Sequence, residues 1–450
     1  MMILSEATPD RQQRIGTNAK GGPMPNFRSF HLLLVLGSAL CTTAGGQVAG
    51  RFSDLPSAAQ SRISEVVARE SNLSETWVRA RLSGSDLHSG NGFGSSLSIS
   101  GDTVVVASRA FGCVEGGAYV FVKPATGWQD ITQTAKLTGS DWGGCGVSGF
   151  DLVAISGDTI IAGPGPSGAS TYVFVKPKGG WKDMTETAQL SPTANLYIMQ
   201  SLAISGNTVA VGYPNAIGNE VGAAAVFVEP AGGWEDMTQQ TATLTASDPN
   251  PGEQLGWAVT IDGNTVMAGA PYANVNGIQS AGAVYVFVRP GTEWADMTQT
   301  AKLTPTYNIG GELGQCLSLR SGVAVACSST TAAFIFVEPV TGWSDMTPTA
   351  ALDNPPNTGG FVSASVSGNV IAVGAPETPG YPLYYGATLA FRKPSNGWQD
   401  VSSPNAAFWG KPSGGSQAIG YSVAVDGSAL VTGAPYFGNA KGIVYLFAPK

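Results

Sequence analysis

The sequence predicts an all-β fold, a seven-bladed β-propeller of four-stranded antiparallel blades, from three observations. The first is a tryptophan segment that returns about every 50 residues, a period typical of repeat architectures whose units are stable only beside their neighbours. The second is a two-residue glycine corner between two apolar runs in each repeat. The third is the phase at which the chain enters and leaves the repeats. The seven tryptophans are Trp77, Trp128, Trp181, Trp234, Trp294, Trp343 and Trp398.

One repeat, residues 93–138, shows the expected unit. Four strands are predicted at residues 93–100, 103–107, 117–122 and 134–138. The second and third strands are nearly continuous apolar runs, as expected when neighbouring blades cover both faces of a sheet. Glycine with Asp or Asn tolerates the left-handed dihedrals of a tight hairpin between the first two strands. The corners are Gly101-Asp102, Gly157-Asp158, Gly206-Asn207, Gly263-Asn264, Ser321-Gly322, Gly368-Asn369 and Gly427-Ser428.

The phase of the chain predicts how the ring closes. Residues 76–83 have the pattern of a fourth strand, and residues 442–447 have the pattern of a third strand with no fourth strand after it. Pairing these two segments completes the seventh blade and removes an open sheet edge. We therefore expect one propeller domain over residues 76–450.

The N-terminal residues predict export. A short basic region at 24–28 precedes an apolar run of about ten residues at 30–40, which is too short for a membrane span. We expect a cleaved signal peptide over residues 1–44, with Met24 as an alternative start. Residues 45–75 are expected to be a linker with a short helix at about 54–71; a linker without structure is the alternative. The protein is thus expected to be secreted or extracytoplasmic and not membrane-spanning after signal removal.

Composition narrows the class of partner. Charged residues make up 12% of the chain, the net charge is −8, and no stretch contains a run of Lys or Arg. Nucleic acid is therefore excluded as a partner, because phosphate neutralisation requires a basic surface.

Two short motifs recur in register with the corners. The first strand begins Leu255-Gly256 or Ile419-Gly420, and the second ends with Gly-Ala-Pro, as at Gly269. The chain therefore resembles the FG-GAP repeat family, the unit of the seven-bladed propeller of integrin α subunits and of exported microbial proteins. The resemblance covers residues 76–450 and implies an adhesion or binding role. It weakens at residues 107–109 and 327–329, which lack Gly-Ala-Pro.

No metal and no cofactor are expected. Many family members carry a calcium loop between the first two strands, but here that corner is two residues long and holds at most one Asp. The alternative ion ligands are the loop carboxylates Asp86, Asp141 and Asp248. His88 is the only histidine after the signal, so a multi-histidine site is excluded, and we expect a solvated loop residue and no general base.

Two side chains that recur around the ring are expected to be architectural. The Asp two residues after each tryptophan is expected to accept backbone N–H bonds in its own turn. The tryptophans are expected to fill gaps between blades; stacking on carbohydrate at each blade is the alternative. The six aspartates are Asp130, Asp183, Asp236, Asp296, Asp345 and Asp400.

Four cysteines follow the signal, and two disulfides are predicted. Cys316 and Cys327 lie five residues out on each side of a corner, which places them opposite each other on paired strands. Cys113 lies in a loop joining strands two and three, and Cys145 in a loop joining two blades, at the same end of the ring. Buried, reduced thiols are the alternative.

This end of the ring is the expected ligand face, because its loops vary in length. Aromatic residues that do not recur collect there, and the scaffold does not need them; ordinary loop aromatics are the alternative. The candidates are Trp142, Tyr197, Tyr272, Tyr307, Tyr381, Tyr384, Tyr385 and Tyr436.

We therefore expect an exported, non-catalytic binding module that presents one loop face to an extracellular protein or glycan. A carbohydrate-acting hydrolase or lyase using loop carboxylates is one alternative, although no acidic pair stands out. A structural envelope protein without a small ligand is another. The fold alone does not choose among them.

Overall fold

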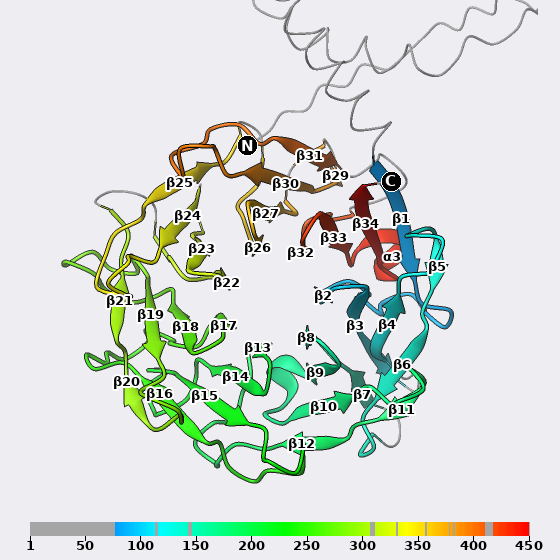
Figure 1. Cartoon of the computed structure of the whole chain (residues 1–450), viewed down its shortest axis with the longest axis horizontal. Coiled ribbons are helices and arrows are strands. Elements are labelled where there is room, and N and C mark those ends of the chain that lie inside the picture. Colours follow the sequence, from blue (N-terminus) through cyan, green and yellow to red (C-terminus); the bar gives the residue numbers. More distant parts are fainter. Residues whose placement is uncertain are drawn as a thin grey trace, which may run out of the picture. The chain divides into compact units, whose positions relative to one another are not determined.

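The computed structural model describes residues 77–112, 116–142, 146–306, 311–329, 332–355, 358–377, 379–380, 383–409 and 417–449. The predicted signal peptide and linker helix lie outside these residues. The described chain forms seven radially arranged, four-stranded antiparallel sheets, which confirms the predicted propeller (Figure 1).

Each blade starts at the ring axis with its first strand and ends at the rim with its fourth. Blade 1 contains β2 (Leu97–Ser100), β3 (Thr103–Gly112), β4 (Gly117–Val122) and β6 (Ala135–Thr138). Blade 2 contains β8 (Leu152–Ser156), β9 (Thr159–Gly163), β10 (Thr171–Val175) and β12 (Ala188–Leu190). Blade 3 contains β13 (Ser201–Ser205), β14 (Thr208–Tyr213), β15 (Ala223–Val228) and β16 (Ala242–Thr245). Blade 4 contains β17 (Val259–Asp262), β18 (Thr265–Ala270), β19 (Ala283–Val288) and β21 (Ala301–Leu303).

The remaining blades repeat this order. Blade 5 contains β22 (Cys316–Arg320), β23 (Val323–Cys327), β24 (Ala332–Val337) and β25 (Ala350–Asp353). Blade 6 contains β26 (Ser363–Ser367), β27 (Val370–Ala375), β30 (Ala387–Arg392) and β31 (Ala406–Trp409). Blade 7 contains β32 (Ser422–Asp426), β33 (Ala429–Ala434), β34 (Ile443–Pro449) and β1 (Trp77–Ser83). Short elements in the loops are β7 (Gly146–Gly149), η2 (Gly165–Ser167), β28 (Pro379–Gly380), β29 (Leu383–Tyr384) and α3 (Phe437–Ala440).

The ring closes as predicted. β1 pairs antiparallel with β34 in a register that runs from Trp77 opposite Pro449 to Leu82 opposite Val444. The blue start of the described chain therefore lies beside its red end (Figure 1). The seventh blade takes its outer strand from the other end of the chain, so no third-strand edge is left open.

The repeated glycines have a packing reason that links one blade to the next. Gly269 is the next-to-last residue of β18, and a Cβ on it would overlap the carbonyl oxygen of Gly314 in blade 5. Gly314 itself has φ +104°, a conformation that favours glycine. The same contact joins Gly374 to Gly420 between blades 6 and 7. The glycine that opens a first strand and the glycine of Gly-Ala-Pro in the preceding blade thus form one close backbone contact between neighbouring blades.

The recurring tryptophans pack between blades, and the alternative of carbohydrate stacking at each blade is excluded for the six whose side chains are described. Trp294, for example, lies among residues of blades 3 and 4, including Leu244 and Val266. Burial this deep leaves no ring face for a ligand. Their exposed fractions lie between 5 and 7%: Trp128, Trp181, Trp234, Trp294, Trp343 and Trp398.

The expected role of the recurring aspartate was wrong. Asp296 does not cap its own turn; its Oδ1 accepts the backbone N–H of Thr243, on the outer strand of the preceding blade, at 2.7 Å. All six aspartates make this inter-blade bond at 2.7–2.9 Å. The Met-Thr that follows pairs in parallel with the same outer strand, as where β20 (Met297–Thr298) meets β16. β5 (Ile131–Thr132) and β11 (Met184–Thr185) pair likewise with β1 and β6. The Trp segment therefore joins each blade to the preceding one by hydrogen bonds and strand pairing.

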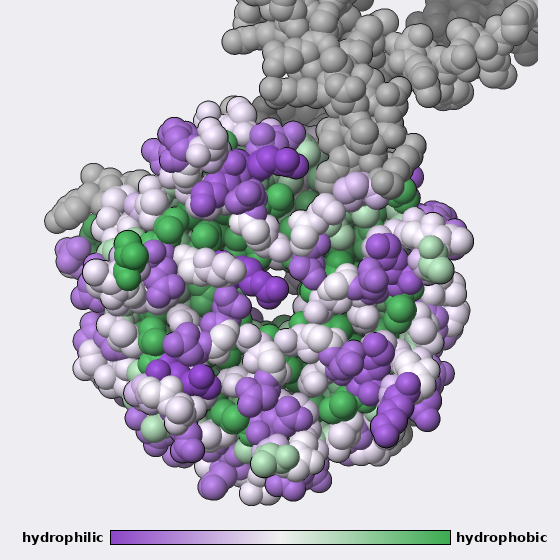
Figure 2. Space-filling view, viewed as in Figure 1, coloured by the Kyte–Doolittle hydropathy of each residue, from purple (hydrophilic) through white to green (hydrophobic). Residues whose placement is uncertain are grey.

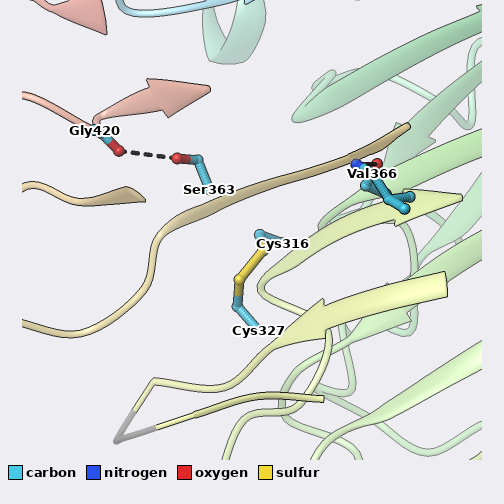
Figure 3. Close-up of a disulfide and its surroundings, with 6 residues drawn as sticks. Cys316, Cys327, Ser363, Val366 and Gly420 are labelled. Carbon is cyan, nitrogen blue, oxygen red and sulfur yellow. Dashed lines mark hydrogen bonds between the residues drawn. A yellow bond between two sulfur atoms is a disulfide. The ribbon is translucent and has the colours of Figure 1, made fainter. Parts of the chain in front are cut away.

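Cys316 and Cys327 are directly opposed on β22 and β23 and form a disulfide, with their Cα atoms 5.0 Å apart (Figure 3). The neighbouring blade lies beside it, where the Ser363 hydroxyl donates to the Gly420 carbonyl at 2.9 Å. Cys113 and Cys145 lie outside the described residues, so their pairing stays a prediction.

Candidate ligand-binding cavity

Exposed apolar side chains gather at one end of the ring. This end, called here the variable-loop end, carries the loops that join the second strand to the third and those that join one blade to the next. Among the described residues, eight large hydrophobic side chains are exposed, and six of them lie in these loops. The six are Tyr197, Ile217, Ile278, Val362, Tyr421 and Tyr436. The other two are Val340, at the opposite end, and Trp409, on an outer strand.

A cavity of about 770 Å³ lies near the ring axis at the variable-loop end, and we call it the axial cavity. Its size is within the range of small-ligand sites, about 300–1,000 Å³. Figure 2 shows one face of the ring, which is open at its centre, with hydrophilic and hydrophobic residues around the opening. Six blades, from the second to the seventh, each contribute a lining residue: Leu152, Gln200, Trp257, Gln315, Val362 and Tyr421.

The start of each first strand explains why these side chains converge. The first strand is the innermost of its blade, so the residues that open it lie closest to the axis. Trp257 follows the motif glycine Gly256 (φ +94°), and Tyr421 follows Gly420 (φ +89°). Aligned blades carry smaller or polar residues at this place: Ser95, Leu152, Ser201, Gln315 and Ser363. The two large aromatics of this position therefore come from blades 4 and 7 alone.

Each of these aromatics is held by a tyrosine from the loop after the second strand. Trp257 and Tyr272 lie edge to face, with ring centroids 5.9 Å apart at 84°. Tyr421 and Tyr436 repeat the arrangement at 5.8 Å and 83°. Such pairs contribute about 0.5–1.5 kcal/mol beyond their buried area and fix the ring planes. Blades 4 and 7 thus present two oriented aromatic platforms at the cavity.

Tyr421 stays a hydrogen-bond donor at neutral pH. Burial raises its pKa above the ordinary value, and the charge and hydrogen bond of Tyr436 add to the rise. Arg109 acts in the opposite direction. Tyr421 is 39% exposed, so a ligand can reach this residue.

Polar groups complete the lining. Gln200 and Gln315 supply amides, and Glu377 supplies a carboxylate. Nearby, Arg109 is ion-paired with Asp151, which stands where other blades carry the motif glycine. The Arg109 carbonyl accepts the Nδ2 hydrogen bond of buried Asn91 at 3.0 Å. Arg109 is therefore already paired with a carboxylate.

Two other cavities lie at the junction of blades 7 and 1. The larger, about 900 Å³, is lined by corner residues at the opposite end of the ring. Its polar groups are engaged: Asp102 pairs with Lys123 at 3.3 Å, and Asp426 accepts the Gly101 N–H at 2.6 Å. We favour the axial cavity because it combines two oriented aromatic platforms with amide groups, of which the Gln315 amide also donates to Glu312 at 2.5 Å.

Two of the predicted ligand residues, Tyr272 and Tyr436, lie at the axial cavity, and Tyr436 lines it. Trp142 instead packs on Phe150, with ring centroids 4.6 Å apart. Tyr197 is exposed and donates its hydroxyl to the Asn215 carbonyl at 2.9 Å, outside the cavity lining.

The remaining predicted residues fall on the loop after β27. Tyr385 is half-buried, and its carbonyl accepts the Ile419 N–H at 3.1 Å. Tyr384 belongs to β29, whose backbone alone is described. Tyr381 lies outside the described residues, as does Tyr307 of another loop. Trp257, Tyr421, Gln200, Gln315 and Glu377 were not predicted; the first two were taken only as part of the first-strand motif.

The loop carboxylates considered as ion ligands bond to tyrosines of the third strand. Asp86 accepts the Tyr119 hydroxyl at 2.7 Å and pairs with Lys136 at 2.6 Å. Burial raises the pKa of Asp86, but the bonds from Lys136 and Tyr119 outweigh it and leave that pKa below its usual value. Asp141 and Asp248 are the corresponding acceptors of Tyr172 and Tyr285.

His88 is exposed in the loop before β2. Within the described ranges, no group of three or more His, Cys, Asp or Glu side chains is arranged to hold a metal ion. No helix in the described part of the chain is both long and apolar enough to cross a membrane.

Fold and cavity together define a seven-bladed β-propeller whose innermost strands surround a ligand-sized cavity. The family model described as FG-GAP repeat matches residues 77–121 and 238–287. These two matches, the motif that recurs blade by blade and the seven-bladed fold together support an FG-GAP propeller protein. No curated protein matches it. Among solved structures it is similar to the computationally designed Ika8 protein, at 12% identity and a TM-score of 0.46, over 82% of this chain and 98% of that chain.

Proposed function

We propose that this protein is an exported, non-catalytic binding module that presents its variable-loop end to an extracellular protein or glycan. The observation that carries the proposal is the axial cavity, with oriented aromatic pairs from blades 4 and 7. The scaffold does not require these aromatics, because the other blades fold with Ser, Leu or Gln at the aligned position.

The distribution of exposed apolar side chains supports the same end. Six of the eight that are described lie in its loops, and apolar side chains gathered on one face of a soluble domain are typical of an interaction surface. Export is supported by the apolar run at residues 30–40 and by the disulfide between Cys316 and Cys327.

A binding role is favoured over glycoside hydrolysis by the charges at the cavity. Hydrolysis needs two carboxyl groups on either side of the scissile bond. Of the described lining residues, Glu377 alone is a carboxylate, and nearby Asp151 is ion-paired with Arg109. Release of reducing sugar from polysaccharides by the purified protein would contradict the non-catalytic part of the proposal.

The test is binding of the purified full chain to extracellular glycans and to isolated envelope proteins. We expect the Trp257→Ala/Tyr421→Ala double variant to lose binding, because both platforms are removed. Trp409→Ala is the matched control, since Trp409 is exposed on an outer strand of blade 6, outside the cavity lining. Binding that survives in the double variant would remove this site, and a wild-type protein that binds nothing would favour a structural envelope role.

A further inference from the structure

We propose that the axial cavity binds an uncharged glycan segment, with a sugar ring stacked on Trp257 or Tyr421 and its hydroxyls bonded to the amides of the lining. This inference rests on the proposed binding function and specifies the ligand of the same site. It is carried by three observations: the aromatic platforms, the type of polar group and the concave shape.

The platforms match the apolar faces of sugar rings. A pyranose presents a flat face of C–H groups, which packs on the face of an aromatic ring held in a fixed plane. Trp257 and Tyr421 are both held edge to face by a second tyrosine, at 84° and 83°. Their planes are therefore set before a ligand arrives, so less side-chain entropy is lost on binding.

The polar groups match hydroxyls better than ionic groups. An amide offers donors and an acceptor, as a sugar hydroxyl does, and Gln200 and Gln315 lie on two separate blades of the lining. The Gln315 amide nitrogen donates to Glu312, which leaves its second N–H and its carbonyl for a ligand. Glu377 adds a carboxylate that accepts from hydroxyl donors. The pKa of Tyr421 lies above its usual value, so its hydroxyl is a donor over the neutral range.

Charge argues against an anionic ligand. The described lining of the axial cavity contains Glu377 and no Lys or Arg, and the whole chain has a net charge of −8. Arg109, beside the cavity, is already paired with Asp151. A sulfated or uronic-acid glycan would face a carboxylate with no cation to offset the repulsion.

Shape argues for a small polar chain end over a broad protein surface. The cavity of about 770 Å³ is enclosed by residues of six blades, from Leu152 in blade 2 to Tyr421 in blade 7. A standard protein interface takes about 20–30 residues from each partner, whereas twelve residues line this cavity. A short chain segment therefore fits the cavity better than a protein surface does.

The experiment compares neutral with acidic oligosaccharides on the full-length chain, by glycan array followed by calorimetry. The neutral probes are oligomers of glucose, mannose, galactose and N-acetylglucosamine; the acidic probes are polygalacturonate and heparin oligomers. We expect at least one neutral series to bind and the acidic probes not to bind. Trp257→Ala should weaken binding by about tenfold or more, and Trp257→Phe by less, because phenylalanine keeps an aromatic face.

Trp409→Ala is the matched control, because Trp409 is 55% exposed on an outer strand of blade 6, away from the cavity lining. It should bind as the wild type does, and thermal unfolding verifies that each variant is folded. Preference for the acidic probes, or binding by the Trp257→Ala/Tyr421→Ala double variant equal to that of the wild type, would overturn the glycan inference. Binding of an envelope protein that is lost in Trp257→Ala would also overturn it, but would leave the binding function standing.

Discussion

At the scale of single residues, recurrence separates architecture from function. Six tryptophans, one in each Trp segment from Trp128 to Trp398, are buried between blades. Trp257 does not recur, and it lies at the cavity. The same residue type thus serves two purposes, and its place in the repeat tells which.

Trp294 tests the architectural role. It is 5% exposed between blades 3 and 4, and its buried indole N–H has no partner among the described residues. Trp294→Ala should lower the free energy of unfolding by about 3–5 kcal/mol, through lost burial and a cavity. Trp294→Phe should cost less than about 1.5 kcal/mol, because it keeps an aromatic ring and removes an unpaired donor.

Urea unfolding monitored by circular dichroism measures both variants. The exposed Trp409→Ala variant should change the same quantity by no more than about 0.5 kcal/mol. If Trp294→Phe proved as costly as Trp294→Ala, the indole N–H would have to make a bond that the structure does not show.

At the scale of strands and loops, the sequence predicted what each blade contains but not how blades are joined. Apolar runs and glycine corners are local patterns, so four strands per unit were readable. The bond from Asp296 to Thr243 spans 53 residues and two blades, and no local pattern signals it. The aspartate was therefore assigned to its own turn.

The candidate site was only partly predictable for a related reason. Tyr272 and Tyr436 stood out because they follow the second-strand motif in loops that vary. Trp257 and Tyr421 sit inside the repeating motif, where their aromatic character looked like ordinary variation. Their convergence depends on the inner strands of separate blades meeting at the axis. An alignment of the seven repeats by this one position would have revealed both.

Cys113 and Cys145 test the strand register near blade 1. β3 pairs with β7 from Arg109 opposite Gly149 to Gly112 opposite Gly146, and the next pair in that register is residues 113 and 145. Peptide mapping without reduction should therefore recover a Cys113–Cys145 link beside Cys316–Cys327. A Cys113–Cys316 link would refute the assignment of these loops.

The two disulfides should stabilise the fold to different extents. The Cys316–Cys327 pair closes a loop with a sequence separation of 11, and the proposed link from residue 113 to 145 closes a longer one. A longer closed loop restricts the unfolded chain more. The Cys113→Ser/Cys145→Ser variant should thus lose more thermal stability than Cys316→Ser/Cys327→Ser.

At the scale of the whole molecule, buried tyrosines predict that the folding stability falls at high pH. Burial raises the pKa of four tyrosines: Tyr119, Tyr172, Tyr213 and Tyr285. Carboxylates add to the rise for all of them except Tyr213. In the unfolded chain these groups ionise near pH 10, while in the fold they keep their protons. Stability is therefore complete below about pH 10 and is lost as pH rises further.

Melting temperatures measured between about pH 8 and pH 11 test this, with tyrosinate absorbance as the second readout. Tyr213→Phe should reduce the fall in the free energy of unfolding at alkaline pH. The reduction is the contribution of one titrating group, about 1.4 kcal/mol per pH unit. An unchanged pH profile in that variant would show that Tyr213 ionises in the folded protein.

Ring closure is the property on which the whole molecule depends. β1 supplies the outer strand of blade 7 by pairing with β34, and it also meets blade 1, where the Arg81 N–H donates to Asp130 at 2.8 Å. A chain beginning at residue 84 should therefore melt at lower temperature and self-associate through the open β34 edge, whereas one beginning at residue 71 should behave as the full chain does. A synthetic peptide of residues 76–84 should restore the melting temperature of the shorter chain, because it supplies the strand with which β34 pairs. If the peptide did not bind, the first strand would contribute to folding in some way other than by closing the ring.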